Sequence, residues 1–360
     1  VEEHHYKIMK AVVIRGSKAV LSRSRELPKL REDCLLVRPV AVALNPTDWR
    51  HIKNRRAKDD CILGCDYSGV VQSVGSRVGH QWKPGDRIFG SAHGANLINP
   101  DEGVFAELAC VIGDLQMRMP ETLTFAQAAT IGLGAGTVGQ GLYQKGLKLD
   151  LPGLEGKRDP RGSSVLIYGG GTSTGALGIQ YAKLSGYNVI TTCSPRHFEY
   201  VKDLGADFAV DYSDSDAGAK IRQYTNNRLT LAWDTISKTD SAHICAEALT
   251  SLPSLKPIYS NLLPVKSPRP DVSSTTTVFH TIFGKPFKFG SQEMQARPED
   301  YEFGKTFYRL TEYLVAKGHL RSHKCRVESG GLEGVIQGLL DLEAGKIRGE
   351  KLVYLVEDTP

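Results

Sequence analysis

The sequence contains no long hydrophobic run. No apolar stretch approaches the roughly 18 consecutive residues that a membrane span requires. The opening VEEHHYKIMK lacks the apolar core of a secretory signal. The seven cysteines are odd in number and scattered, which is typical of reduced thiols rather than of a disulfide framework. We therefore expect a cytoplasmic protein that does not associate with membranes.

Strong charge of either sign is also missing. The formal net charge is +5 over 360 residues, and the basic residues are dispersed. This is weaker than the basic stripe of a nucleic-acid-binding protein, so we expect no nucleic-acid partner. The mild positive charge is compatible with an acidic partner or a phosphorylated ligand. The length suits two domains with substantial cores.

Two different patterns of predicted secondary structure follow one another along the chain. Before about residue 124, short β-branched segments alternate with glycine and Pro-Gly turns, which predicts a compact β-rich fold. From about residue 163, strands and helices alternate, and this predicts an open parallel sheet with ligands at the carboxyl ends of its strands. The tail adds two helices and a last strand, KLVYLV. Segments 145–162 and 283–300 look like long irregular loops.

The segment IYGGGTSTGALG (167–178) joins the first strand of the alternating part to its helix. It does not have the G-x-G-x-x-G spacing, and it has no Gly-Lys-Ser/Thr, so a phosphate loop of an NTPase is not expected. Glycines at such a turn let the backbone approach a pyrophosphate at the positive end of the helix. The candidate cofactor-binding residues here are Gly169, Gly171 and Gly175, with Thr172, Ser173 and Thr174 as hydroxyl donors.

No acid ends the second strand of this part. NAD-preferring sites usually place Asp or Glu there to hold the ribose 2′-hydroxyl, whereas this chain has TTCSPRHF. Ser194, Arg196 and His197 suit a 2′-phosphate, and Tyr212 could flank the same adenosine. The pattern therefore favours NADPH. A plainer interpretation, which is compatible with the first, is that Ser194 caps the next helix and Pro195 opens it.

Several motifs together resemble the zinc-independent medium-chain dehydrogenase/reductase superfamily. They are LNPTDWR, LGCDYSGVVQSVG, KPGDRIFG, the glycine turn, LGAD and GEKLVYLV, in the order that the superfamily keeps. The resemblance implies an α/β protein with a β-rich GroES-like catalytic domain (1–135 and 290–360). It also implies a Rossmann NADPH-binding domain with a doubly wound parallel sheet (136–289).

Within the superfamily, the chain most resembles the fungal trans-acting enoyl reductases that serve highly reducing polyketide synthases. NPTD, LGCDYSG, YGGGTSTG, SGYNVITTCSP, TIFG and GEKLV carry this resemblance. It implies that the partner is the carrier domain of such a synthase, or of a synthase–peptide synthetase hybrid, and that the substrate is a small enoyl group.

The residues for a catalytic zinc are missing. Zinc members of the superfamily have a Cys where this chain has Asn45, a His where it has Cys65, and a Cys near Leu133. These three residues cannot supply the three ligands that a catalytic zinc needs. The C-x₃-C pair formed by Cys61 and Cys65 has no second pair, so we expect core thiols and no metal.

Without a metal, the chemistry that fits is reduction of a C=C bond already polarised by a conjugated carbonyl. Hydride from nicotinamide C4 would reach the β-carbon, and the carbonyl oxygen would need hydrogen-bond donors. By position, Thr137 is the candidate hydroxyl beside the nicotinamide or the carbonyl, Asn45 orients nicotinamide or substrate, and Arg50 lies near the substrate. Ile282, Phe283 and Lys351 are expected to line the cofactor cleft.

Each candidate also has a structural explanation. Thr137 could cap a helix, Asn45 could close the Asn-Pro turn, and Arg50 could be a surface charge.

We predict an NADPH-dependent trans-acting enoyl reductase that reduces the α,β C=C bond of a carrier-bound polyketide thioester. Two alternatives stay open: a stand-alone NADPH-dependent quinone or 2-alkenal reductase, and a non-catalytic binding protein that keeps the cofactor fold.

Overall fold

The computed structural model describes residues 8–153 and 163–360. The chain divides into two compact units, Val1–Leu133 with His280–Pro360 (unit 1) and Gly134–Phe279 (unit 2). The junctions predicted from the sequence were 135/136 and 289/290, so the second junction lies closer to the N-terminus than predicted. The opening residues 1–7 and the second half of the predicted loop 145–162, namely 154–162, lie outside the described residues.

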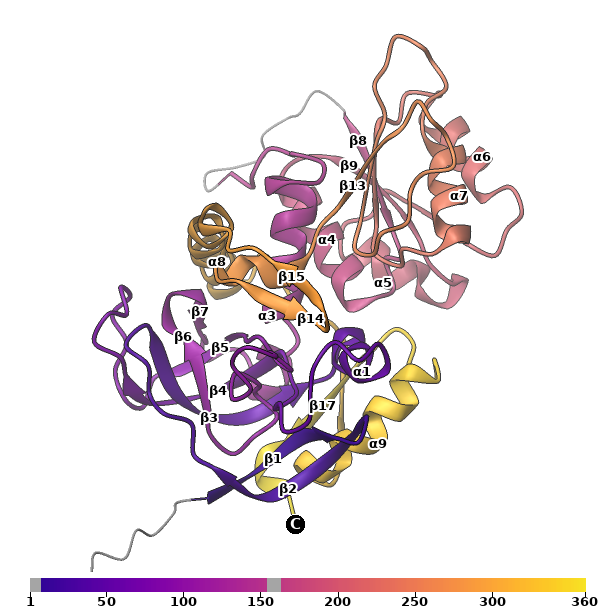
Figure 1. Ribbon diagram of the computed structural model, residues 1–360. Helices are drawn as coiled ribbons and strands as arrows, with labels where there is room; N and C mark the ends of the chain where they lie inside the picture. The colour runs from indigo at the N-terminus through magenta and orange to yellow at the C-terminus, as the bar shows by residue number, and fades with distance from the viewer. Residues whose placement is uncertain (1–7, 154–162) are drawn as a thin grey trace, which may run out of the picture. The chain divides into compact units, whose positions relative to one another are not determined.

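Unit 1 is built around a seven-stranded sheet in the order β16-β17-β3-β4-β5-β7, with β6 also paired to β3. Its strands are β3 (Cys34–Ala43), β4 (Asp66–Val74), β5 (Arg87–Ser91), β6 (Ala109–Ile112), β7 (Gln116–Arg118), β16 (Cys325–Glu328) and β17 (Lys351–Leu355). A separate antiparallel hairpin consists of β1 (Ile8–Arg15) and β2 (Lys18–Glu26) (Figure 1).

Local chemistry explains two features of these strands. Gly16 and Ser17 both have positive φ, as a tight turn between twisted antiparallel strands requires. Pro39 lies within β3, where it has no N–H to give to the ladder, and the pairing of β3 with β4 shifts register between Pro39 and Ala41.

Helices and a second hairpin complete unit 1. The helical segments are α1 (Pro46–Lys53), η1 (Gly113–Leu115), α2 (Phe125–Ala128), α8 (Pro298–Ala316), α9 (Gly331–Glu343) and η5 (Val356–Asp358). The hairpin is formed by β14 (Phe287–Phe289) and β15 (Gln292–Met294), within a stretch where the sequence suggested an irregular loop. Two helical segments contain the unit junctions: α3 (Gly132–Val138) and η4 (Phe279–Phe283).

Unit 2 contains the predicted parallel sheet. Its six strands are all parallel and lie in the order β10-β9-β8-β11-β12-β13, the strand order of a Rossmann fold. The strands are β8 (Ser164–Tyr168), β9 (Asn188–Thr192), β10 (Phe208–Val210), β11 (Leu231–Asp234), β12 (Ile258–Asn261) and β13 (Ser273–Thr276). The predicted α/β architecture is therefore confirmed.

Helices cover both faces of this sheet. They are α4 (Ser173–Leu184), η3 (Pro195–His197), α5 (Phe198–Asp203), α6 (Ala217–Tyr224) and α7 (Thr239–Ala248). Figure 1 shows α4 and α5 on one side of the sheet and α6 and α7 on the other. Trp233 of β11 is fully buried, and a Cβ added at Gly178 of α4 would lie 2.6 Å from its ring. Glycine at 178 therefore lets α4 approach the sheet closely.

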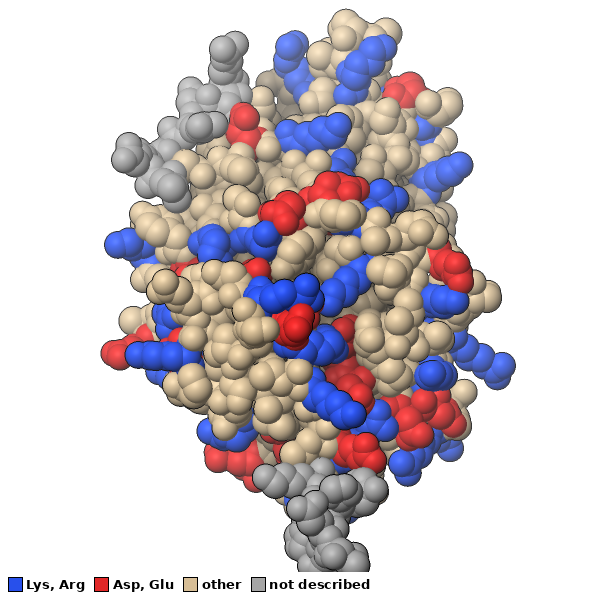
Figure 2. All heavy atoms as spheres, turned by 60° about the vertical axis from the view of Figure 1, so that its left-hand side comes forward, with Lys and Arg blue, Asp and Glu red and all other residues tan. Residues whose placement is uncertain are grey.

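The surface and the helices agree with the charge and hydropathy of the sequence. On the face that Figure 2 presents, Lys and Arg side chains are interspersed with Asp and Glu. Among the helices of the described residues, none is both long and apolar enough to cross a membrane.

Candidate cofactor and active site

The glycine turn follows β8 and is attached to the end of β9. Gly169 has φ +87°, a conformation that favours glycine. Its N–H donates to Thr192 Oγ1 at 3.1 Å, and the N–H of Gly170 donates to the Thr192 carbonyl at 2.9 Å. The turn therefore lies beside the residues that follow β9.

The first turn of α4 packs directly on this glycine turn. A Cβ at Gly175 would lie 2.2 Å from the Gly169 carbonyl oxygen, so only glycine fits there. Thr172 is the N-cap of α4: its Oγ1 accepts from Gly175 N–H at 3.0 Å and donates to the Gly169 carbonyl at 2.8 Å. The Ser173 hydroxyl is buried and has no hydrogen-bond partner in the described part of the chain. Thr174 follows it in the same turn.

Predicted residues also gather at the ends of β9 and β10. The hydroxyls of Ser194 and Tyr212 lie 3.2 Å apart. A Cβ at Gly171 would be 3.4 Å from the His197 ring, so this histidine flanks the turn. Arg196 is exposed and forms no ion pair within the described residues. The carboxyl ends of β8, β9 and β10 thus collect hydroxyls, a cation and backbone N–H groups.

Unit 1 contains a buried ion pair beside Asn45. Lys351 Nζ lies 2.5 Å from Asp66 Oδ2, and the two side chains are 3% and 0% exposed. Asn45 contacts both partners, because its Oδ1 accepts from Lys351 at 3.0 Å and its Nδ2 donates to Asp66 at 2.9 Å. Asp66 Oδ1 accepts from the N–H of Leu133, in the first turn of α3, at 2.6 Å.

These residues do not fit a catalytic zinc. Asn45 and Leu133 stand at or near the positions where zinc members have cysteines. Both donate hydrogen bonds to Asp66, and the ammonium group of Lys351 lies in the same cluster. Cys65 is fully buried, and burial raises the pKa of its thiol. Within the described ranges, no group of three or more His, Cys, Asp or Glu could hold a metal ion.

Asp48 is an acid in the same region with an altered pKa. Burial raises its pKa to about 7, although one oxygen accepts a 2.7 Å hydrogen bond from Asn45 N–H. This contact and the extended backbone of Asn45 make Asn45 the N-cap of α1. Asn45 therefore both starts a helix and holds the ion pair.

The structure divides the other predicted residues between the units. Thr137 is buried on α3 in unit 2. Arg50 lies on α1 in unit 1, over the Trp49 ring at 5.3 Å. Ile282 and Phe283 are buried in unit 1, where Ile282 packs at Gly304 and Phe283 stacks on His93. The catalytic and cofactor roles of these residues remain predictions.

The sequence analysis did not predict a cluster of three buried histidines in unit 1. The His280 ring lies 5.3 Å from His51 and 4.6 Å from His93, measured between ring centres, and Phe287 and Phe289 pack around them. Burial lowers the pKa of His51 to about 4 and that of His93 to about 3. At neutral pH these rings are uncharged and pack like aromatic side chains.

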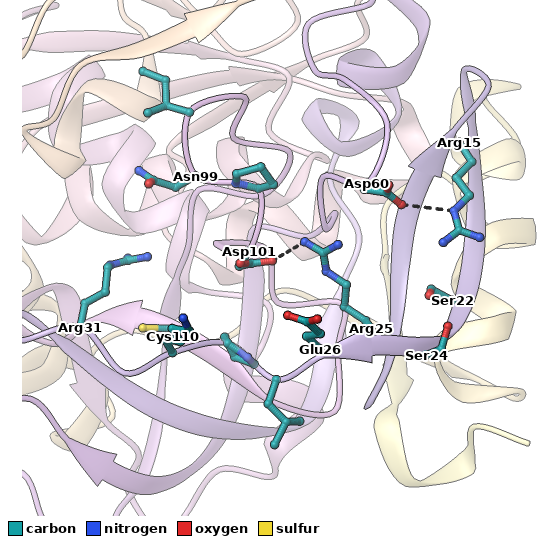
Figure 3. Close-up of a pocket in the computed structure, with 15 residues that line it drawn as sticks. Arg15, Ser22, Ser24, Arg25, Glu26, Arg31, Asp60, Asn99, Asp101 and Cys110 are labelled. Carbon is teal, nitrogen blue, oxygen red and sulfur yellow. Dashed lines mark hydrogen bonds and ion pairs between the residues drawn. The ribbon is translucent and has the colours of Figure 1, made fainter. Parts of the chain in front are cut away.

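A cavity of about 720 Å³ in unit 1 is not part of the predicted site. It is lined by β2 and neighbouring loops, and its charges are largely paired: Arg15 with Asp60 at 3.3 Å, and Arg25 with Asp101 (Figure 3). None of the predicted site residues lines it.

Asp66 is the residue that sequence reasoning should have found. The sequence analysis assigned it no role of its own. Asp66 stands at the start of β4, whose first four residues are buried, and a buried acid needs a partner. The sequence did not indicate that this partner is Lys351, because the two residues are 285 positions apart.

Two protein families match the chain. Residues 31–121 match the alcohol dehydrogenase GroES-like domain, and residues 174–251 match the zinc-binding dehydrogenases. A structure of an alcohol dehydrogenase superfamily protein from Novosphingobium aromaticivorans has a TM-score of 0.76 at 23% identity, covering 97% of this chain and 99% of that one.

Two curated relatives are more similar in sequence. The trans-enoyl reductase resD of Aspergillus sclerotiorum is 42% identical, over 97% of this chain and 100% of its own length. The trans-enoyl reductase TOXD of Cochliobolus carbonum is 46% identical, over 83% of this chain and 98% of its own length. The chain therefore belongs to the medium-chain dehydrogenase/reductase superfamily and, within it, to the trans-enoyl reductases, a family of oxidoreductases.

Proposed function

We propose that this protein is an NADPH-dependent enoyl reductase acting in trans on a polyketide synthase. It reduces the α,β C=C bond of an enoyl thioester carried by the synthase, with hydride going to the β-carbon and no metal taking part. The observation that carries the proposal is the acid-free end of β9 beside the glycine turn, in a chain closely related to trans-enoyl reductases.

The residues after β8, β9 and β10 fit a phosphorylated dinucleotide. The unpartnered hydroxyl of Ser173 is buried in the first turn of α4, where a pyrophosphate would meet backbone N–H groups. Arg196, which has no acidic partner in the described residues, and the Ser194–Tyr212 hydroxyl pair are the groups we assign to the 2′-phosphate. When bound, NADPH supplies the hydride.

The side chains of unit 1 and α3 have positioning roles in this proposal. The Asn45 side chain hydrogen-bonds to both Lys351 and Asp66, so we assign it the role of positioning that ion pair. Asp66 binds the first turn of α3, the helix that carries Thr137, and so fixes the place of that helix start. We propose that the Thr137 hydroxyl donates toward the thioester carbonyl as negative charge grows there. A proton then completes the product at the α-carbon.

The first test is turnover with defined substrates. The purified full chain should oxidise NADPH in the presence of a crotonyl-pantetheine thioester and yield the saturated thioester, as followed by nicotinamide absorbance and product mass. Menadione and a short 2-alkenal should react much more slowly. Failure to reduce the thioester, or faster reduction of the quinone or the alkenal, would overturn the proposal.

The second test concerns cofactor choice. Arg196→Glu places an acid in η3, shortly after β9, where we expect it to repel a 2′-phosphate and to accept from a 2′-hydroxyl. We expect the KM for NADPH to rise about tenfold or more, which corresponds to at least about 1.4 kcal/mol, while that for NADH does not rise. The matched control is Arg228→Glu, an exposed arginine before the amino end of β11. An unchanged preference in Arg196→Glu would contradict the assignment.

A further inference from the structure

The C-terminal part of α1 and the turn after it carry an unusual run of cations. Five of nine residues in RHIKNRRAK are Lys or Arg. Lys53 pairs with Glu343 of α9 at 2.8 Å. The other four form no ion pair within the described residues, and we call them the α1 basic patch: Arg50, Arg55, Arg56 and Lys58.

Carboxylates near the patch are engaged elsewhere. Asp59 accepts from Gly16 N–H at 3.1 Å, and Asp60 pairs with Arg15 at 3.3 Å. On the hairpin that packs against this turn, Glu293 pairs with Lys288 at 2.5 Å. None of these three carboxylates forms an ion pair with the patch within the described residues.

The end of the helix does not use the patch side chains as caps. The carbonyls of Arg50, His51 and Ile52 already accept backbone N–H groups of residues 54–56, at 2.9–3.1 Å. The cations gain a modest interaction with the negative end of the helix dipole, but they are not needed to satisfy its carbonyls.

Aromatic rings hold two of the patch arginines. The Arg50 guanidinium lies 5.3 Å from the Trp49 ring centre, and that of Arg56 lies 4.8 Å from the Phe289 ring centre. Both are half-buried, whereas Arg55 and Lys58 are exposed. Burial, and then the charge of Arg56, lower the pKa of Arg50. Like charges are thus held close together, and an anionic surface would relieve their repulsion.

We propose that the α1 basic patch is the docking surface for an acidic protein domain, namely the carrier domain that delivers the enoyl thioester. The inference rests on the proposed function and extends it to the partner. Complementary charge would speed the encounter and orient the carrier. The N-cap of the same helix is Asn45, and eight helical residues span about 12 Å, so the patch lies close to the buried ion pair.

The test compares two double variants with the same change in net charge. Arg55→Glu/Lys58→Glu reverses the exposed part of the patch and leaves Arg50 intact. Lys18→Glu/Lys83→Glu is the control, at two exposed lysines elsewhere in unit 1. The substrates are crotonyl-pantetheine and the same group on a purified acidic carrier domain. Thermal melting verifies that both variants are folded.

We expect the patch variant to raise the KM for the carrier-bound substrate about tenfold, with the control within about twofold of the parent. Added salt should raise the parent's KM for the carrier-bound substrate in the same direction. Activity on free crotonyl-pantetheine should be unchanged in both variants. Equal KM values for the carrier-bound substrate in the two variants would overturn the docking proposal.

Binding of the carrier domain keeps the two proposals separable. Biolayer interferometry with the immobilised carrier domain measures docking without turnover. If the parent reduces no thioester, the proposed function is wrong. The docking proposal is tested separately: it requires that the Kd for the carrier domain rise in the patch variant and not in the control. Tighter binding of the parent to anionic vesicles than to the carrier domain would also count against a protein partner.

Discussion

Lys351→Met is expected to destabilise the protein strongly. It leaves the Asp66 carboxylate fully buried, with Asn45 Nδ2 and Leu133 N–H as its remaining donors among the described residues. Removing one partner of a buried pair costs about 3–5 kcal/mol, which corresponds to a fall in Tm of roughly 10 °C or more for a unit of this size. Differential scanning calorimetry measures it.

Two companion variants identify the cause. Lys346→Met makes the same change in an exposed pair, Lys346–Asp341 at 2.8 Å, and should shift Tm by no more than about 2 °C. In Asp66→Asn/Lys351→Met both charges are gone, so much of the lost stability should return, with the Asn45 amide free to turn toward the new side chain. If Lys351→Met and Lys346→Met have the same Tm, the buried pair does not stabilise the fold as predicted.

Gly175→Ala should damage both unit 2 and cofactor binding. The new methyl group would lie 2.2 Å from the Gly169 carbonyl oxygen and 3.0 Å from Gly170 Cα, and both are backbone atoms that cannot turn aside. The first turn of α4 must therefore move away from the glycine turn, at a cost of about 1–3 kcal/mol or more. We expect a lower Tm and an NADPH Kd raised about tenfold or more, measured by calorimetry and fluorescence titration.

Gly171→Ala is the matched comparison within the same turn. Its added Cβ would meet only side-chain atoms, the nearest being His197 Cδ2 at 3.4 Å. We expect Tm to stay near that of the parent while NADPH binding weakens, because a methyl group would face the ligand. A Gly175→Ala protein with the parent's Tm and Kd would show that α4 does not need this close approach.

The regular parts of the fold could be predicted because their signals are local. The alternation of strands and helices after residue 163 gave the parallel sheet, and glycines before an apolar helix gave the turn at Gly169–Gly175. The strands β14 and β15 were missed because each has three residues, too few for a period to be recognised. The polar strand β13 was missed because SSTT has no apolar face.

The candidate site was less predictable because its contacts join distant residues. Asn45 and Lys351 were chosen by motif, but their shared contact with Asp66 depends on bringing strands β4 and β17 together. The histidine cluster joins α1, the loop after β5 and η4, and nothing in the local sequence distinguishes these rings from exposed ones. Burial, which decides their pKa, is a property of the fold.

The division of unit 1 into two chain segments sets the order in which the protein can fold during synthesis. All strands of the unit 2 sheet lie between residues 164 and 276, so that sheet can close while the C-terminal segment is still being made. Strand β3 cannot complete its pairing until β17 has been made, because Ala43 of β3 pairs with Val353 of β17. Until then, the part of β3 that β17 pairs, Ala41–Ala43, is open to other chains and Asp66 lacks its lysine partner. The segment that contains β17, which is made after all of unit 2, therefore completes the pairing of β3 and the charge pair in the same step.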